Sequence, residues 1–197
     1  MKRLILILIL VLSFNYSGYS QNDKLIPKAL AIKIAFENLQ KDSNSIELQK
    51  KYIDLFPDNE VIFKKIFASP TFDQLYMQSD SYIFKLSKIW DNDPVLIGAK
   101  LIRLCIGFKY WEADAIGYIQ NISIDFANSH LPIFTKLVEN LTSMEQDILI
   151  TFLADVENHK AYECYQKLID HLIEINQNDL ADKFEKARTV RVKQKHD

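Results

Sequence analysis

Apolar residues recur along this chain at spacings of three and four, the period of an amphipathic α-helix. The clearest stripes are Tyr165, Leu168, Ile169 and Leu172, and then Leu180, Phe184 and Ala187. The pattern predicts ten helices, over residues 24–40, 45–56, 59–68, 72–90, 94–109, 112–128, 131–140, 143–158, 160–176 and 179–194. We expect Val95–Ile106, which is apolar on nearly all sides, to be the central and most enclosed helix.

Helix starts punctuate this pattern. Three pairs fit the capping box, in which each side chain satisfies a backbone amide: Asn44 with Glu47, Thr71 with Gln74, and Thr142 with Glu145. Asp93 before Pro94 is a second kind of start, a cap followed by a residue whose fixed φ suits the first helical position.

The links between predicted helices are short and polar, which favours antiparallel neighbours. No Asn-Gly or Asp-Gly turn separates alternating segments, so β-hairpins are poorly supported. We therefore predict an all-α fold, an irregular helical bundle or a short solenoid-like stack of antiparallel helix pairs, with about nine to ten helices. Its helix spacing is loosely that of tetratricopeptide or HEAT arrays, without their recurring residues.

The N-terminus has the pattern of a secretory signal peptide. Lys2 and Arg3 precede the apolar run Leu4–Leu12, and Gly18-Tyr19-Ser20 supplies small residues for cleavage. The run is about half of the ~18 residues that span a bilayer, so no integral membrane segment is expected after cleavage. The sequence predicts a cleaved leader over residues 1–20 and a single helical domain over 21–197, exported to the periplasm or secreted.

Composition narrows the classes of partner. The chain is 48% hydrophobic and 12% aromatic, enough to fold unaided, and its net charge is −2. Loss of Lys2 and Arg3 makes the charge more negative, so nucleic acid is not an expected ligand. Cys105 and Cys164 are too few for a disulfide framework, and whether they pair is open.

Glycine is scarce. Only Gly98, Gly107 and Gly117 follow the leader, and a glycine-rich dinucleotide loop or phosphate-binding loop is therefore absent from the sequence. No cofactor is predicted. The three glycines favour close helix packing, and the alternative is a bend that lines a ligand cavity.

One cluster could carry acid–base chemistry or hold a divalent metal. It contains Asp155, Glu157 and His159, at the end of the eighth predicted helix. Continued helix would align Asp155, His159 and Glu163 on one face, whereas a turn near Asn158 would make this a structural corner. No metal site is predicted. The other histidines, His130, His171 and His196, have no sequence-local partner.

Two surface features could meet a partner. The C-terminal helix or tail is basic, with Lys183, Lys186, Arg188, Arg191, Lys193 and Lys195. Such charges complement the helix dipole, and they would also permit weak contact with an anionic surface. Tyr110-Trp111 either packs into the core or forms an exposed anchor for a protein partner.

The function that the sequence favours is recognition of another protein, because helical surface is abundant and cofactor motifs are lacking. A small exported helical protein is similar in general form to periplasmic inhibitors or immunity proteins. The alternatives are a metal-assisted or acid–base hydrolase acting through Asp155, Glu157 and His159, and a stabilising subunit of an envelope complex. Enzymatic activity is the less favoured class.

Overall fold

The computed structural model describes residues 26–69, 73–110, 112, 114–156 and 159–194, and these residues form eleven α-helices and no β-strand. The all-α prediction is confirmed. The elements are a helix over residues 26–41, then α2 (Ile46–Leu55), α3 (Glu60–Phe67), α4 (Asp73–Met77), α5 (Ser79–Ser87), the 3₁₀ turn η2 (Trp90–Asn92), α6 (Pro94–Phe108), α7 (Ala115–Ser129), α8 (Leu131–Glu139), α9 (Ser143–Ala154), α10 (His159–Glu174) and α11 (Asn178–Gln194). The predicted leader, residues 1–20, lies outside the described residues. None of the described helices combines the length and apolarity needed to cross a membrane.

Two predicted helices differ from the structure. The helix expected over 72–90 is divided, because the backbone of Gln78 (φ −121°, ψ 22°) leaves the helical region between α4 and α5. The helix expected over 143–158 ends at Ala154, and Asp155 follows with ψ 44°. Both differences arise where the apolar spacing continues through a change of backbone direction.

Two of the four predicted helix starts are confirmed. Thr142 and Glu145 form a capping box, and the Asp93 carboxylate accepts a hydrogen bond from the Leu96 amide at 3.0 Å. At α2 the capping residue is Ser45, not Asn44, because the Ser45 hydroxyl accepts from the Leu48 amide. The pair Thr71 and Gln74 cannot be compared, since Thr71 lies outside the described residues.

The chain divides into two compact units, residues 1–56 and residues 57–197. In the first unit the helix over 26–41 and α2 share aromatic contacts. The ring centroids of Phe36 and Tyr52 lie 6.0 Å apart, and those of Tyr52 and Phe56 lie 6.1 Å apart.

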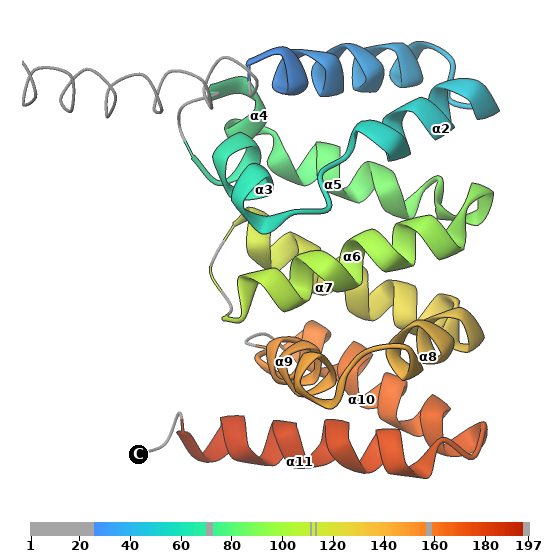
Figure 1. Cartoon of the computed structure of the whole chain (residues 1–197), viewed down its shortest axis with the longest axis vertical. Helices are drawn as coiled ribbons and strands as arrows, with labels where there is room; N and C mark the ends of the chain where they lie inside the picture. Colours follow the sequence, from blue (N-terminus) through green and yellow to red (C-terminus); the bar gives the residue numbers. More distant parts are fainter. Residues whose placement is uncertain (1–25, 70–72, 111, 113, 157–158, 195–197) are drawn as a thin grey trace, which may run out of the picture. The chain divides into compact units, whose positions relative to one another are not determined.

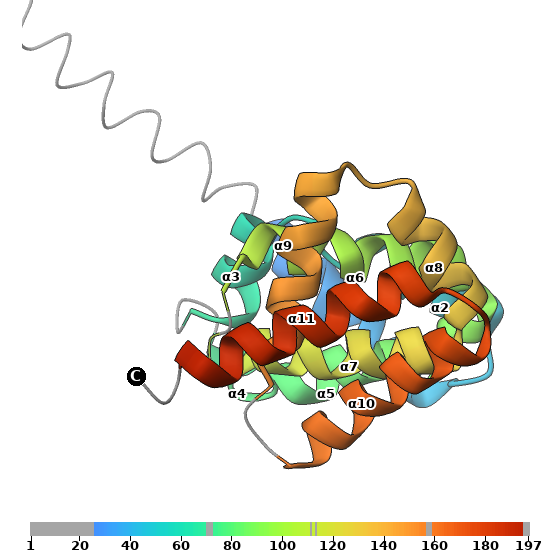
Figure 2. The same cartoon turned by 90° about the horizontal axis from the view of Figure 1, so that it is seen from below.

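In the second unit the helices stack in two rows. One row is α3, α6 and α9, the other is α5, α7 and α10, and neighbours within each row are in contact. The rows meet where α6 packs against α7, and α11 lies across α9 and α10. Figure 1 shows the succession of layers, and in Figure 2 the α5, α7 and α10 row lies below the α3, α6 and α9 row. This arrangement resembles the solenoid-like stack of helix pairs that the sequence favours.

The centre of this unit is α7, not the segment Val95–Ile106. Ten of the fifteen residues of α7 are buried, against eight of the fifteen in α6. The prediction that α6 is the most enclosed helix is therefore wrong. The reason is topological: α7 is surrounded by α5, α6, α8, α9 and α10, whereas Val95 at the start of α6 is exposed.

Candidate functional site

The predicted Asp155 cluster lies at the turn between α9 and α10, where arginine side chains of α11 contact it. Asp155 caps the C-terminal end of α9, is only 6% exposed and forms an ion pair with Arg191 of α11. Arg188, one turn earlier on α11, donates from Nη1 to the carbonyls of Ala154 and Val156, each at 3.2 Å. The Arg188 guanidinium also lies 4.9 Å from the ring centroid of Tyr162.

This corner differs from the arrangement that acid–base or metal chemistry requires. Asp155 ends one helix and His159 begins another, so no single helical face carries both with Glu163. Glu157 lies outside the described residues. Within the described ranges, no group of three His, Cys, Asp or Glu side chains could hold a metal ion. The hydrolase assignment stays a prediction without a contact that favours it.

The two cysteines are free thiols in different surroundings. Cys105 of α6 is fully buried, and its sulfur lies 3.3 Å from the Ser123 hydroxyl of α7. Cys164 of α10 is half-buried and lines a pocket. The question of whether the two cysteines pair is thereby answered: they do not pair in this structure.

The pocket that contains Cys164 lies between α5, α7 and α10 and is called here the α7–α10 pocket. It has a volume of about 180 Å³. Its lining residues are Phe84 from α5, Asn121, Ile124 and Asp125 from α7, and Lys160, Ala161 and Cys164 from α10. Three of them are apolar and four carry groups that hydrogen-bond, so the pocket suits a ligand with one apolar and one polar end.

The polar groups of this pocket act on one another. The Cys164 thiol donates a hydrogen bond to the Asp125 carboxylate. Burial raises the pKa of Asp125, while the Cys164 hydrogen bond and the Lys160 ammonium oppose that rise. Burial and the nearby Asp125 charge also raise the pKa of Cys164, although Lys160 and Lys167 act in the other direction. The thiol therefore stays protonated, which makes it a donor and a poor nucleophile.

A second pocket lies beside the first, along α7. It is lined by Tyr76, Met77, Ser79, Asp80, Asp114 and Tyr118 and has a volume of about 220 Å³. The rings of Phe84 and Tyr118, which line one pocket each, are 5.5 Å apart and separate the two. Asp114 has a φ of 60°, a region that non-glycine residues rarely adopt.

His130 has a partner that is distant in sequence. Its Nε2 lies 3.0 Å from Asp91 Oδ1, and its ring packs on Phe126 and Trp90. His171 lies on α10, where its carbonyl accepts from the Ile175 amide. His196 lies outside the described residues. The aromatic contacts give His130 a packing role at the α7–α8 junction.

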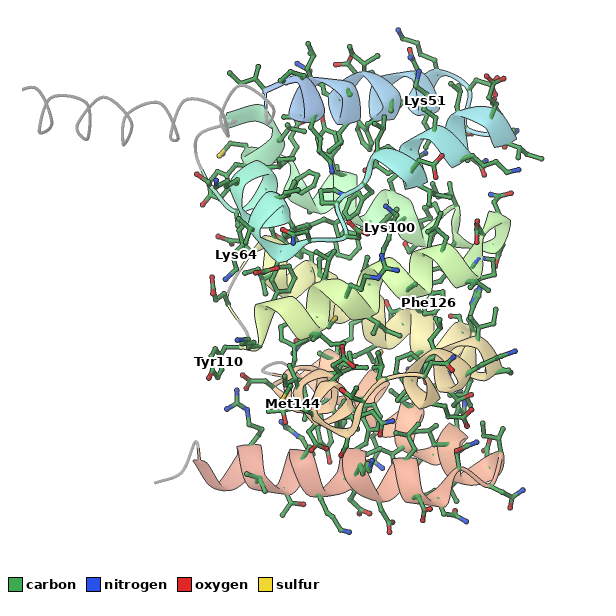
Figure 3. The ribbon with its side chains drawn as sticks, viewed as in Figure 1. Lys51, Lys64, Lys100, Tyr110, Phe126 and Met144 are labelled. Atoms are coloured by element: carbon green, nitrogen blue, oxygen red, sulfur yellow. The ribbon has the colours of Figure 1, made fainter. Side chains whose placement is uncertain are left out.

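The structure treats the two surfaces that the sequence offered for a partner, Tyr110-Trp111 and the basic C-terminal helix, differently. Tyr110 is 69% exposed, so core packing is the wrong interpretation for this residue, and Figure 3 shows it at the edge of the view beyond the end of α6. Trp111 lies outside the described residues. On the basic helix, Arg188 and Arg191 contact the α9–α10 corner and Lys183 donates to Gln146 at 2.8 Å, so these residues have partners within the chain. Contact of α11 with an anionic surface stays a prediction.

An apolar stripe is exposed on the helix over residues 26–41. Ile26, Leu30 and Ile34 follow one another at intervals of four and are 58%, 54% and 45% exposed. The opposite side of the same helix is also apolar and is buried through Ala29, Ile32, Phe36 and Leu39. This helix therefore has an apolar side in the core and a second one at the surface.

Sequence reasoning missed Asp125 and Lys160 as pocket residues. They lie on two helices, and no local motif connects them. The one available signal is the spacing of four between Asn121 and Asp125 and between Lys160 and Cys164, which places each pair on one helical face. Comparison with protein-family models, curated proteins and solved structures finds no match for this chain.

Proposed function

We propose that this chain is an exported helical protein whose role is to bind another protein through the stripe of Ile26, Leu30 and Ile34. The exposure of these three side chains on one helical face is the observation that carries the proposal. Large contiguous apolar patches on a surface mark interaction sites, because their exposure to water is unfavourable.

The geometry of the stripe fits recognition of a helix by a groove. Anchors that repeat every three to four residues on one helix are the form in which an amphipathic helix docks against a partner. Full burial of a large aliphatic side chain contributes about 1.5–3 kcal/mol. These three side chains are about half exposed, so a partner that covers the stripe gains roughly half of that value from each anchor. An inhibitor or immunity-type protein of the periplasm would have use for such a contact.

Site-specific photo-crosslinking tests the proposal. A photoreactive phenylalanine analogue at position 30 or 34 is expected to capture a discrete partner in the compartment to which the chain is exported. The same analogue at Met144, an exposed position of the second unit, is the matched control and is expected to capture nothing discrete.

A double substitution separates binding from folding. Leu30→Glu with Ile34→Glu places charges on the stripe and is expected to abolish the crosslinked product formed from position 26. Lys51→Glu, a charge change at an exposed site of α2, should leave it intact. Crosslinks only between copies of this chain, or equal products from both variants, would contradict the proposal.

Export is tested separately. When the full chain is produced in a Gram-negative host, the mature N-terminus is expected at Gln21, as N-terminal sequencing would show. Ile7→Arg interrupts the apolar run and is expected to leave the leader attached and the protein in the cytoplasm. A wild-type chain that retains residues 1–20 would refute this part of the proposal.

A further inference from the structure

The α7–α10 pocket presents opposite charges on two helices that are in contact and run in the same direction (Figure 1). Asn128 of α7 donates from Nδ2 to the carbonyl of Cys164 at 2.9 Å, and Asp125 accepts from the Cys164 thiol. These contacts fix the register of the two helices. Asn121 and Lys160 each lie four residues before this level, and both line the same pocket.

The residues that carry the two charges lie about one helical turn apart along the backbone of these parallel helices. Four residues of α-helix rise about 6 Å, so Asp125 and Cys164 form one end of the polar rim, and Asn121 and Lys160 form the other. A carboxylate from one helix and an ammonium from the other complement a ligand whose own ammonium and carboxylate are attached to the same carbon atom. Such a ligand is a zwitterion of the α-amino acid type.

The remaining walls are apolar. Phe84, Ile124 and Ala161 supply carbon surface beside the charged rim. The pocket volume of about 180 Å³ exceeds the roughly 150 Å³ of an apolar cavity that takes up benzene, so an aliphatic side chain of four or so carbons can enter.

We propose that the α7–α10 pocket binds a free α-amino acid with an apolar side chain. Asp125 receives the ligand ammonium, Lys160 and the Asn121 amide receive its carboxylate, and the side chain lies against Phe84, Ile124 and Ala161. This site is distinct from the stripe on the helix over residues 26–41 and does not depend on the proposed protein partner.

Titration with L-leucine tests the site. With ¹⁵N-labelled full-length mature protein, L-leucine is expected to shift the amide signals of Asn121, Asp125 and Cys164 in a saturable way, and calorimetry gives the affinity. N-acetyl-leucine lacks the ammonium and leucinamide lacks the carboxylate. Each is expected to bind about tenfold more weakly or worse, because each loses one charge-assisted contact.

Substitutions locate the two charges. Asp125→Asn and Lys160→Gln are each expected to weaken L-leucine binding by about tenfold or more. Asp147→Asn and Lys136→Gln, the same chemical changes at exposed positions on α9 and α8, should leave the affinity unchanged. Circular dichroism verifies that each variant is folded.

Three results would overturn the inference. The first is the absence of saturable shifts at these residues up to the solubility limit of L-leucine. The second is equal affinity for L-leucine and N-acetyl-leucine, which would show that the pocket accepts apolar groups without recognising the zwitterion. The third is full binding by folded Asp125→Asn and Lys160→Gln variants.

Discussion

The two thiols of the second unit, Cys105 and Cys164, differ in burial and in the charges near them, and both have a raised pKa. Burial raises the pKa of Cys105 to about 12, although the hydrogen bond with Ser123 acts in the opposite direction. Cys164 is half-buried, and burial together with the Asp125 carboxylate raises its pKa as well. Because only the thiolate is nucleophilic, both cysteines are less reactive than an ordinary thiol at neutral pH.

Removal of the Asp125 charge is therefore expected to activate Cys164. In Asp125→Asn the thiolate loses an unfavourable neighbour, so the pKa of Cys164 falls and its alkylation by iodoacetamide at pH 8 becomes several-fold faster. Peptide-resolved mass spectrometry measures the rate against pH. Asp147→Asn is the control on α9 and should leave the pH dependence of Cys164 alkylation unchanged. An unchanged or slower alkylation rate in Asp125→Asn would show that the Asp125 carboxylate does not raise the pKa of the thiol.

Gly98 allows α6 to approach two helices closely. A Cβ atom at this position would lie 2.7 Å from the Phe126 ring and 2.8 Å from Leu137 Cδ1. The buried Phe126 ring packs against Trp90 and His130, so it has little room to move. These contacts agree with close helix packing, the first of the two explanations that the sequence left open.

Gly98→Ala is expected to destabilise the protein. Overpacking costs about 1–3 kcal/mol, and the better helix propensity of alanine returns only about 1 kcal/mol. We expect a net loss of up to about 2 kcal/mol, measured as a lower urea midpoint at constant slope. If alanine raised the midpoint, the packing around Phe126 would have to be looser than the structure shows.

At the scale of elements, α11 fixes the corner between α9 and α10. Arg188 donates to the carbonyls of Ala154 and Val156, which the end of α9 leaves without helical partners. The planar guanidinium can bond two carbonyls and stack on Tyr162 together, which a lysine ammonium cannot reproduce. At this position a basic residue of α11 therefore stabilises the fold of the chain itself.

Arg188→Lys is expected to lower the free energy of unfolding by about 1.5–3 kcal/mol, the range for hydrogen bonds to a charged group. Lys186→Ala, at an exposed site two residues earlier on the same helix, should change it by less than about 0.5 kcal/mol. Urea unfolding followed by circular dichroism compares the two. Equal effects of both substitutions would show that the corner does not depend on Arg188.

Local signals explain which elements could be predicted from the sequence. The capping box of Thr142 and Glu145 and the Asp93-Pro94 start were predicted because each acts within one turn of backbone. The end of α9 at Ala154 was not, because its carbonyls are satisfied by Arg188, 34 residues away in sequence. The α7–α10 pocket was missed for the same reason, since Asp125 and Lys160 meet only through tertiary packing.

At the scale of the molecule, the contacts divide the chain at Phe56 and Pro57, although the sequence there is only a short link between α2 and α3. The prediction of a single domain over residues 21–197 rests on length, because a chain of that size lies within the usual range for one domain. The stacking of α6 and α7 could be anticipated in outline from short links and apolar faces. That α7 is the more enclosed helix could not, because it depends on which helices lie beside it.

Because Cys105 is buried, the rate at which a thiol reagent labels it measures whether the second unit opens cooperatively. Cys105 lies on α6 against Ser123 of α7, so a reagent reaches its sulfur only when the two rows of the second unit separate. With the half-buried thiol removed by Cys164→Ser, labelling of Cys105 in native buffer is expected to be at least about a thousandfold slower than in high urea, since domains are stable by roughly 5–15 kcal/mol.

The urea dependence of the labelling rate distinguishes global from local opening. If the second unit opens as a whole, the logarithm of the rate rises with urea at the slope given by circular dichroism, whereas local fraying of α6 gives a shallow slope. Labelling in native buffer at the unfolded rate would mean that α6 and α7 do not form the packed centre described for this unit.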